Sequence, residues 1–148
     1  MPEPRSKYRV MIVEDDLADA NILQQAFHRC GDYFDCEHID NGTMAFERLI
    51  GCKTGVSDDR PDLLVLDLDL PGMRGEQLMA LCRLSSDIEH MPIVVLSGSI
   101  DGEADMRGQF SEGVHAMAKP GDWSGYRDTA LSILRIAAQH AGAPRLNA

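Results

Sequence analysis

Short apolar runs alternate with longer amphipathic runs along the chain, and this alternation limits the folds that the sequence can adopt. Each apolar run is long enough for one strand, and the amphipathic runs repeat their apolar residues at helical spacing. Five strand–helix units in succession predict a parallel sheet covered by helices on both faces. The expected strands are Tyr8–Val13, Phe34–Ile39, Leu63–Leu66, Ile93–Leu96 and Val114–Ala118.

Four of the helical patterns are clear and one is weak. Asp16 precedes the first pattern, where its side chain can cap the N-terminus of a helix. The weak pattern covers residues 101–112 and is interrupted by Gly102 and Gly108. The apolar positions of the clear patterns are Leu23, Ala26, Phe27 and Cys30; Phe46, Leu49 and Ile50; Leu78, Leu81 and Cys82; and Tyr126, Ala130, Ile133, Leu134 and Ala137.

The expected strands differ in composition, and the difference predicts their order. LLVL and IVVL are apolar throughout, which is typical of central parallel strands buried on both faces. FDCEHI alternates and VHAMA is short, so both favour the sheet edges. Strands one, three and four inside and strands two and five outside match the order 2-1-3-4-5 of a flavodoxin-like, doubly wound α/β fold. In such a sheet the binding crevice lies beyond the carboxyl ends of strands one and three.

Length and charge narrow the class of protein. The chain has 148 residues, so we expect one domain over 1–148, with a core at about 8–140 and short tails. It has 14 Lys and Arg against 24 Asp and Glu, and the net charge of -10 disfavours binding to nucleic acid or anionic membranes. The sequence shows neither a membrane-spanning run nor the apolar core of a signal peptide. We therefore expect a cytoplasmic protein.

Functional groups gather where the expected strands end. Because the carboxyl ends of parallel strands meet at one edge of a sheet, these groups should share one crevice. Clustered carboxylates repel one another, and a hard divalent cation such as Mg²⁺ relieves that repulsion. An ammonium beside the metal suits phosphoryl transfer with a carboxylate as the acceptor. The residues are Glu14, Asp15 and Asp16 after the first strand, Asp67 and Asp69 after the third, Ser97 after the fourth and Lys119 after the fifth.

At these residues the chain resembles the receiver domain of two-component response regulators. The segments VEDD, DLLVLDLDLPGMRG, VVLSGS and AKP occur in the order and spacing of that family, and the resemblance runs from about Tyr8 to the last helix. The resemblance implies that Asp67 is the phospho-accepting aspartate. It implies that Ser97 is the switch hydroxyl and that Lys119 is the lysine that pairs with the phosphoryl group.

The same resemblance implies a Mg²⁺ site. Asp15 would bind the metal directly, Glu14 would act through water, and Asp67 and the backbone carbonyl of Asp69 would complete the protein ligands. The family also commonly has a cis peptide between the lysine and the following proline, here Lys119 and Pro120.

Three positions depart from the family's pattern. Ala116 stands three residues before Lys119, where the family often has an aromatic residue whose rotation reports phosphorylation. Gly121 replaces the usual bulky residue after Lys-Pro, and Gly98 stands where alanine is common. The rotation of a coupled aromatic ring is therefore in doubt for this chain.

The resemblance also implies partners. A stand-alone receiver takes its phosphoryl group from a sensor histidine kinase or a histidine phosphotransfer protein, signals by binding a partner, and catalyses only its own phosphotransfer and dephosphorylation. The segment VEDDLADANILQQAF and the polar loop before the third strand resemble regulators paired with phytochrome-type histidine kinases. One alternative is a magnesium-dependent phosphatase with an aspartyl nucleophile, since Asp69 follows Asp67 by two residues as a second acid would. Another is a pseudo-receiver that is never phosphorylated.

The last expected helix carries more apolar residues than one sheet face needs, which predicts a homodimer through this helix. Alternatively, the C-terminal tail folds back over the surplus. The surplus residues are Leu131, Leu134 and Ala138.

Overall fold

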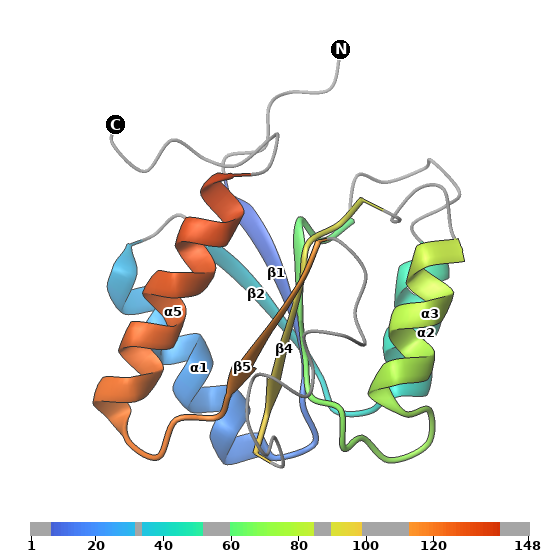
Figure 1. Ribbon diagram of the computed structural model, residues 1–148, viewed down its shortest axis with the longest axis horizontal. Coiled ribbons are helices and arrows are strands. Elements are labelled where there is room, and N and C mark those ends of the chain that lie inside the picture. Colours follow the sequence, from blue (N-terminus) through green and yellow to red (C-terminus); the bar gives the residue numbers. More distant parts are fainter. Residues whose placement is uncertain (1–6, 32–33, 52–59, 85–89, 99–112, 140–148) are drawn as a thin grey trace.

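The computed structural model describes residues 7–31, 34–51, 60–84, 90–98 and 113–139 (Figure 1). Its centre is a parallel sheet of five strands in the order β2-β1-β3-β4-β5, which confirms the predicted fold. The strands match their predicted bounds, except that β4 is one residue longer. They are β1 (Tyr8–Val13), β2 (Phe34–Ile39), β3 (Leu63–Leu66), β4 (Ile93–Ser97) and β5 (Val114–Ala118).

The four clear helical patterns all form helices. They are α1 (Leu17–Cys30), α2 (Gly42–Gly51), α3 (Gly75–Leu84) and α5 (Trp123–Ala138). The weak pattern at 101–112 lies outside the described residues. Helices α1 and α5 cover one face of the sheet, and α2 and α3 cover the other (Figure 1).

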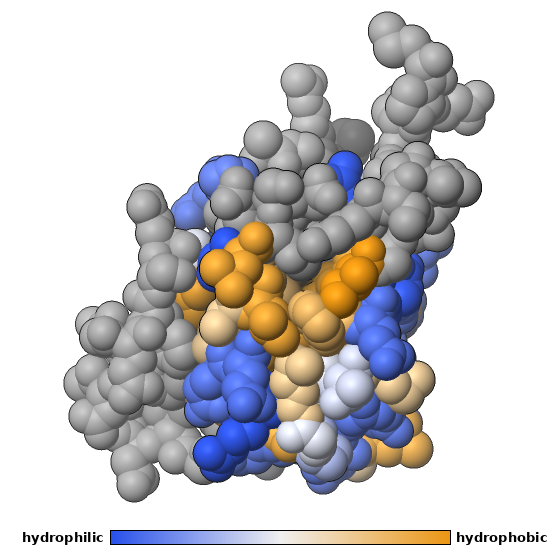
Figure 2. Space-filling view, turned by 90° about the vertical axis from the view of Figure 1, so that its right-hand side faces the viewer, coloured by the Kyte–Doolittle hydropathy of each residue, from blue (hydrophilic) through white to orange (hydrophobic). Residues whose placement is uncertain are grey.

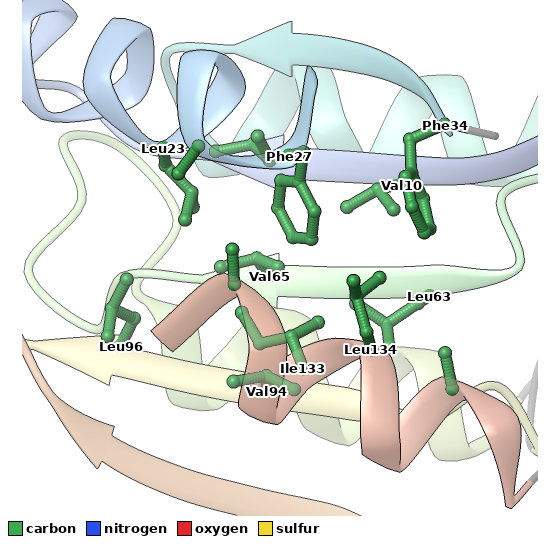
Figure 3. Close-up of a cluster of buried hydrophobic side chains, with 14 of the residues drawn as sticks. Val10, Leu23, Phe27, Phe34, Leu63, Val65, Val94, Leu96, Ile133 and Leu134 are labelled. Carbon is green, nitrogen blue, oxygen red and sulfur yellow. The ribbon is translucent and has the colours of Figure 1, made fainter. Parts of the chain in front are cut away.

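The continuous apolar runs of the strands are explained by these two helix layers. Alternate side chains of a strand point to opposite faces, so Val10 and Ile12 of β1 pack toward α1 and α5, whereas Met11 and Val13 pack toward α2 and α3. Figure 3 shows the first of these clusters, where Phe27 of α1 and Ile133 of α5 meet the side chains of the sheet. Both faces of the central strands are therefore buried, and polar residues are left to the strand ends.

Helix α5 buries a wider arc than the sequence predicts. The stripe expected to face the sheet is buried, but Leu134, predicted as surplus for a partner, is also buried, with 6% of its surface exposed. That part of the prediction is wrong because α5 packs against α1 as well as against the sheet. Leu131 remains 41% exposed, and Ala138 is exposed too.

The opposite side of the molecule presents both apolar and polar surface. Figure 2 looks onto the side that carries α2 and α3, where hydrophobic patches lie between hydrophilic ones. On these helices Met44, Ile50 and Leu84 are exposed by 55%, 38% and 82%. None of the helices in the described part of the chain has the length and apolar character of a membrane span.

Candidate functional site

The register of the central strands brings two acidic residues together. β1 and β3 are neighbours in which Val13 lies beside Leu66, so Glu14 and Asp67 leave the sheet side by side. The backbone N–H of Asp67 donates to the carbonyl of Val13 at 3.0 Å, which continues the pairing for one more residue. The lower edge of the sheet in Figure 1 is this carboxyl end of the strands.

Three carboxylates form the acidic part of the site. Glu14, Asp15 and Asp67 each offer an oxygen, and these oxygens all lie within 4.8 Å of one another. Glu14 and Asp67 are buried, with 6% and 5% exposed, whereas Asp15 is exposed. A set of hard oxygen donors with one side open to solvent fits Mg²⁺, which retains several waters when a protein binds it.

Lys119 is the cation of the site and contacts three carboxylates, one that follows β1, one in α1 and one that follows β3. Its Nζ lies 2.9 Å from Oε2 of Glu14, 3.1 Å from Oδ2 of Asp19 and 3.2 Å from Oδ2 of Asp67. Burial by itself lowers the pKa of Lys119, but its hydrogen bonds to Glu14 and Asp19, together with the negative charges of Glu14 and Asp67, outweigh burial and raise that pKa above its ordinary value. The ammonium is therefore charged at any physiological pH.

Glu14 is the carboxylate most affected by its surroundings. Burial raises its pKa to about 7, although hydrogen bonds from Lys119 and from the backbone N–H of Asp16 oppose that shift. The Asp16 N–H donates to Oε1 of Glu14 at 3.0 Å, and a ring nitrogen of His38 lies 2.7 Å from the Glu14 carbonyl oxygen. These contacts hold Glu14 at the floor of the site.

A tight loop after β3 positions Asp67. The backbone N–H of Asp69 donates to Oδ1 of Asp67 at 3.0 Å and fixes the carboxylate plane. Gly75, at the start of α3, donates to the carbonyl of Leu68 at 3.2 Å. A Cβ at Gly75 would lie 2.7 Å from Cα of Leu68 and 2.8 Å from the carbonyl oxygen of Asp67, so only glycine fits there. Within the loop, Gly72 has a φ of +76°, which glycine adopts without strain.

Asp16 and Asp19 have different roles at the start of α1. Asp16 is the N-cap of α1, as predicted, and its Oδ1 accepts from the backbone N–H of Asp19 at 3.1 Å. Asp19 itself reaches Lys119, a contact that was not predicted from the sequence. An acidic residue in the first turn of a helix is ordinary, because it interacts favourably with the helix dipole, so no signal in the sequence distinguishes Asp19.

Ser97 and Ala116 belong to the two strands at one side of the sheet, β4 and β5. Ser97 ends β4 and lies beside Ala118 of β5 in the sheet register. The position of the Ser97 side chain lies outside the described residues. Ala116 is partly buried and packs against the cluster formed with α2 and α3, without a ring at that position.

The Lys119–Pro120 peptide is trans, like the other peptide bonds of the described residues. The implication of a cis bond is therefore wrong for this structure. Trans is the lower-energy form of an X–Pro bond by about 0.5–1 kcal/mol, and in this form the Lys119 ammonium reaches its three carboxylates.

Part of this chain is similar in sequence to a known response regulator. The DNA-binding response regulator MtrA of Mycobacterium tuberculosis is 36% identical over 95 residues, which are 64% of this chain and 36% of MtrA. This chain thus matches little more than a third of that relative's length.

Solved structures match over more of their length. The phosphorylated cyanobacterial phytochrome response regulator RcpA superposes with a TM-score of 0.78 at 26% identity, over 94% of this chain and 99% of RcpA. The Mn²⁺-bound response regulator Rcp1 has the same fold, with a TM-score of 0.74 at 22% identity, over 93% of this chain and 99% of Rcp1. Residues 10–123 match the family described as the response regulator receiver domain. With that match over most of its length, this chain belongs to the response regulator receiver domain family.

Proposed function

We propose that this chain is a stand-alone response regulator that accepts a phosphoryl group on Asp67 from a sensor histidine kinase or a histidine phosphotransfer protein. One observation carries the proposal. The buried carboxylate of Asp67 lies 3.2 Å from the Lys119 ammonium and belongs to the cluster of three acidic oxygens within 4.8 Å. A carboxylate held between a fixed ammonium and a metal site has the surroundings that an attacking phosphoryl acceptor needs.

The reaction would be a displacement at phosphorus. A carboxylate oxygen of Asp67 forms the new P–O bond as the P–N bond of a phosphohistidine breaks, and the imidazole leaves and recovers a proton. The product is an aspartyl phosphate, a mixed anhydride. Lys119 stabilises the negative charge on the phosphoryl oxygens, and the backbone N–H of Asp69 holds the other carboxylate oxygen.

Mg²⁺ is the cofactor that we propose for this step. Asp15, Asp67 and the backbone carbonyl of Asp69 would hold it, and Glu14 would act through a water molecule. When bound, the metal would neutralise the charge of the incoming phosphoryl group. The charges of the described site support a bound cation, since the carboxylates of Glu14, Asp15 and Asp67 outnumber the ammonium of Lys119.

Structural neighbours support a phytochrome-type histidine kinase as the phosphoryl donor. RcpA is a phytochrome response regulator, and its superposition on this chain covers nearly all of both proteins. We further propose that signalling proceeds by partner binding and that the exposed Leu131 of α5 belongs to a homodimer contact.

The test uses acetyl phosphate, a donor that needs no kinase. With Mg²⁺, intact mass spectrometry should show one added phosphoryl group on the wild type and none on Asp67→Asn. Asp40→Asn is the matched control, because Asp40 is an exposed carboxylate that follows β2, and it should be phosphorylated normally. Equal labelling of Asp67→Asn and wild type would refute the assignment. Steady turnover of a small phosphate ester would instead favour the phosphatase alternative.

A further inference from the structure

A contact outside the acidic cluster connects Lys119 to two helices. Oδ2 of Asp19, in the first turn of α1, accepts a hydrogen bond from Lys119 at 3.1 Å. The Asp19 carboxylate also accepts a hydrogen bond from the hydroxyl of Tyr126 in α5. Burial and this carboxylate raise the pKa of Tyr126 to about 12, so its hydroxyl remains a donor. Lys119, Asp19 and Tyr126 therefore form a continuous chain from the site to the α1–α5 layer.

The hydrogen-bonding capacity of Lys119 is already filled. A lysine ammonium has three N–H donors and no acceptor, and Glu14, Asp19 and Asp67 supply three carboxylate oxygens between 2.9 and 3.2 Å. A phosphoryl group on Asp67 takes up one carboxylate oxygen and brings three anionic oxygens, so the N–H that now bonds Oδ2 of Asp67 can turn to one of them. Lys119 can bind more than one of them only if it also releases Glu14 or Asp19.

Of these two carboxylates, Asp19 loses less on release. The side chain of Glu14 is 7% exposed, whereas that of Asp19 is 31% exposed. Leaving a buried carboxylate without its counter-charge is costly, but a partly exposed one is hydrated by solvent. Asp19 also keeps the hydrogen bond from Tyr126.

We propose that Asp19 is a positioning residue that holds Lys119 in the unphosphorylated protein and releases it when the phosphoryl group arrives on Asp67. This inference rests on the proposed function and adds its regulation. Breaking the Asp19 contact frees one carboxylate between α1 and α5, so phosphorylation is coupled to the packing of these helices. The coupling is reciprocal, and a partner that binds across α1 and α5 therefore changes the occupancy of the site.

Beryllofluoride, an analogue of the phosphoryl group, tests the proposal without a kinase. Its binding to the full chain with Mg²⁺ is followed by ¹⁹F NMR of the bound fluorides. Asp19→Asn removes both the competing charge and the ion pair, so we expect affinity to increase on the order of fivefold, the lower end of typical coupling between linked contacts. Asp16→Asn is the matched control. It removes a charge at the same helix end, and asparagine caps a helix as well as aspartate does.

Two further variants separate positioning from a structural role. Asp19→Glu restores the carboxylate and should return the affinity toward that of the wild type. Tyr126→Phe removes the hydroxyl that orients Asp19 and should increase affinity by less than Asp19→Asn. Because both changes act through one contact, the double variant Asp19→Asn/Tyr126→Phe should bind like Asp19→Asn alone. Urea unfolding establishes that each variant is folded under the binding conditions.

Each outcome decides between the two proposals. Unchanged or weaker beryllofluoride binding by folded Asp19→Asn overturns the inference, as does an equal gain in Asp16→Asn. Additive effects in the double variant refute the link through Tyr126. If the wild type itself shows no Mg²⁺-dependent binding that Asp67→Asn abolishes, the proposed function fails first.

Discussion

Replacing Lys119 by alanine should impair binding of the phosphoryl group more than it impairs folding. Removing one partner of a buried ion pair costs about 3–5 kcal/mol when the remaining charge is left uncompensated. Here the cost should be smaller, because the pKa of Glu14 is already about 7 and this carboxyl can bind a proton at neutral pH. We expect the free energy of unfolding to fall by about 2 kcal/mol at pH 7 without Mg²⁺.

The pH dependence of this loss has a definite sign. Without the ammonium, the folded-state pKa of Glu14 rises further above the ordinary value of 4.5. The folded variant then binds more protons than the unfolded chain between these two values, so its stability decreases as the pH rises. The loss relative to wild type should be larger at pH 8 than at pH 6, and Mg²⁺ should reduce it by supplying a counter-charge.

Affinity for beryllofluoride should respond more strongly. A hydrogen bond to a charged group contributes about 1.5–3 kcal/mol, so losing the Lys119 contact should weaken binding at least about tenfold. Urea unfolding at both pH values, with and without Mg²⁺, gives the stability, and ¹⁹F NMR gives the affinity. The control is Lys7→Ala, a change at an exposed lysine. Wild-type affinity for beryllofluoride in a strongly destabilised Lys119→Ala variant would refute the reasoning.

Three further predictions concern the metal, the loop and the helix surface. Asp15→Asn should abolish Mg²⁺-dependent labelling by acetyl phosphate and leave the circular dichroism spectrum unchanged, because Asp15 is an exposed member of the carboxylate cluster; normal labelling would mean that Asp15 only binds solvent. Gly75→Ala should lower the free energy of unfolding by about 1–3 kcal/mol, because its Cβ would lie 2.8 Å from the carbonyl oxygen of Asp67; an unchanged urea midpoint would contradict that close approach. Sedimentation at micromolar concentration should show a wild-type dimer that Leu131→Glu dissociates, since Leu131 is 41% exposed, and a monomeric wild type would remove the dimer.

Local pattern predicted the elements and separated the inner strands from the edge strands, and the flavodoxin-like fold that matches this arrangement supplied the strand order. The alternation of apolar and amphipathic runs predicted every described strand and helix, because the spacing of apolar residues follows the period of the helix or strand that they form. The fully apolar composition of LLVL and IVVL placed β3 and β4 inside the sheet. Once the strand order was known, the rule that strand ends meet at one edge brought Glu14, Asp15, Asp67 and Lys119 together.

Packing between elements decided what local pattern could not. Leu134 was predicted for a partner but is buried, because α5 packs against α1 as well as against the sheet and so buries a wider arc. Asp19 looked like an ordinary first-turn carboxylate, and only the position of α1 beside the end of β5 brings it to Lys119. Such contacts join residues 100 positions apart. The periodicity of one segment encodes which face of that segment is apolar, but the side chain that meets a given ammonium depends on how a helix is placed against the end of a distant strand.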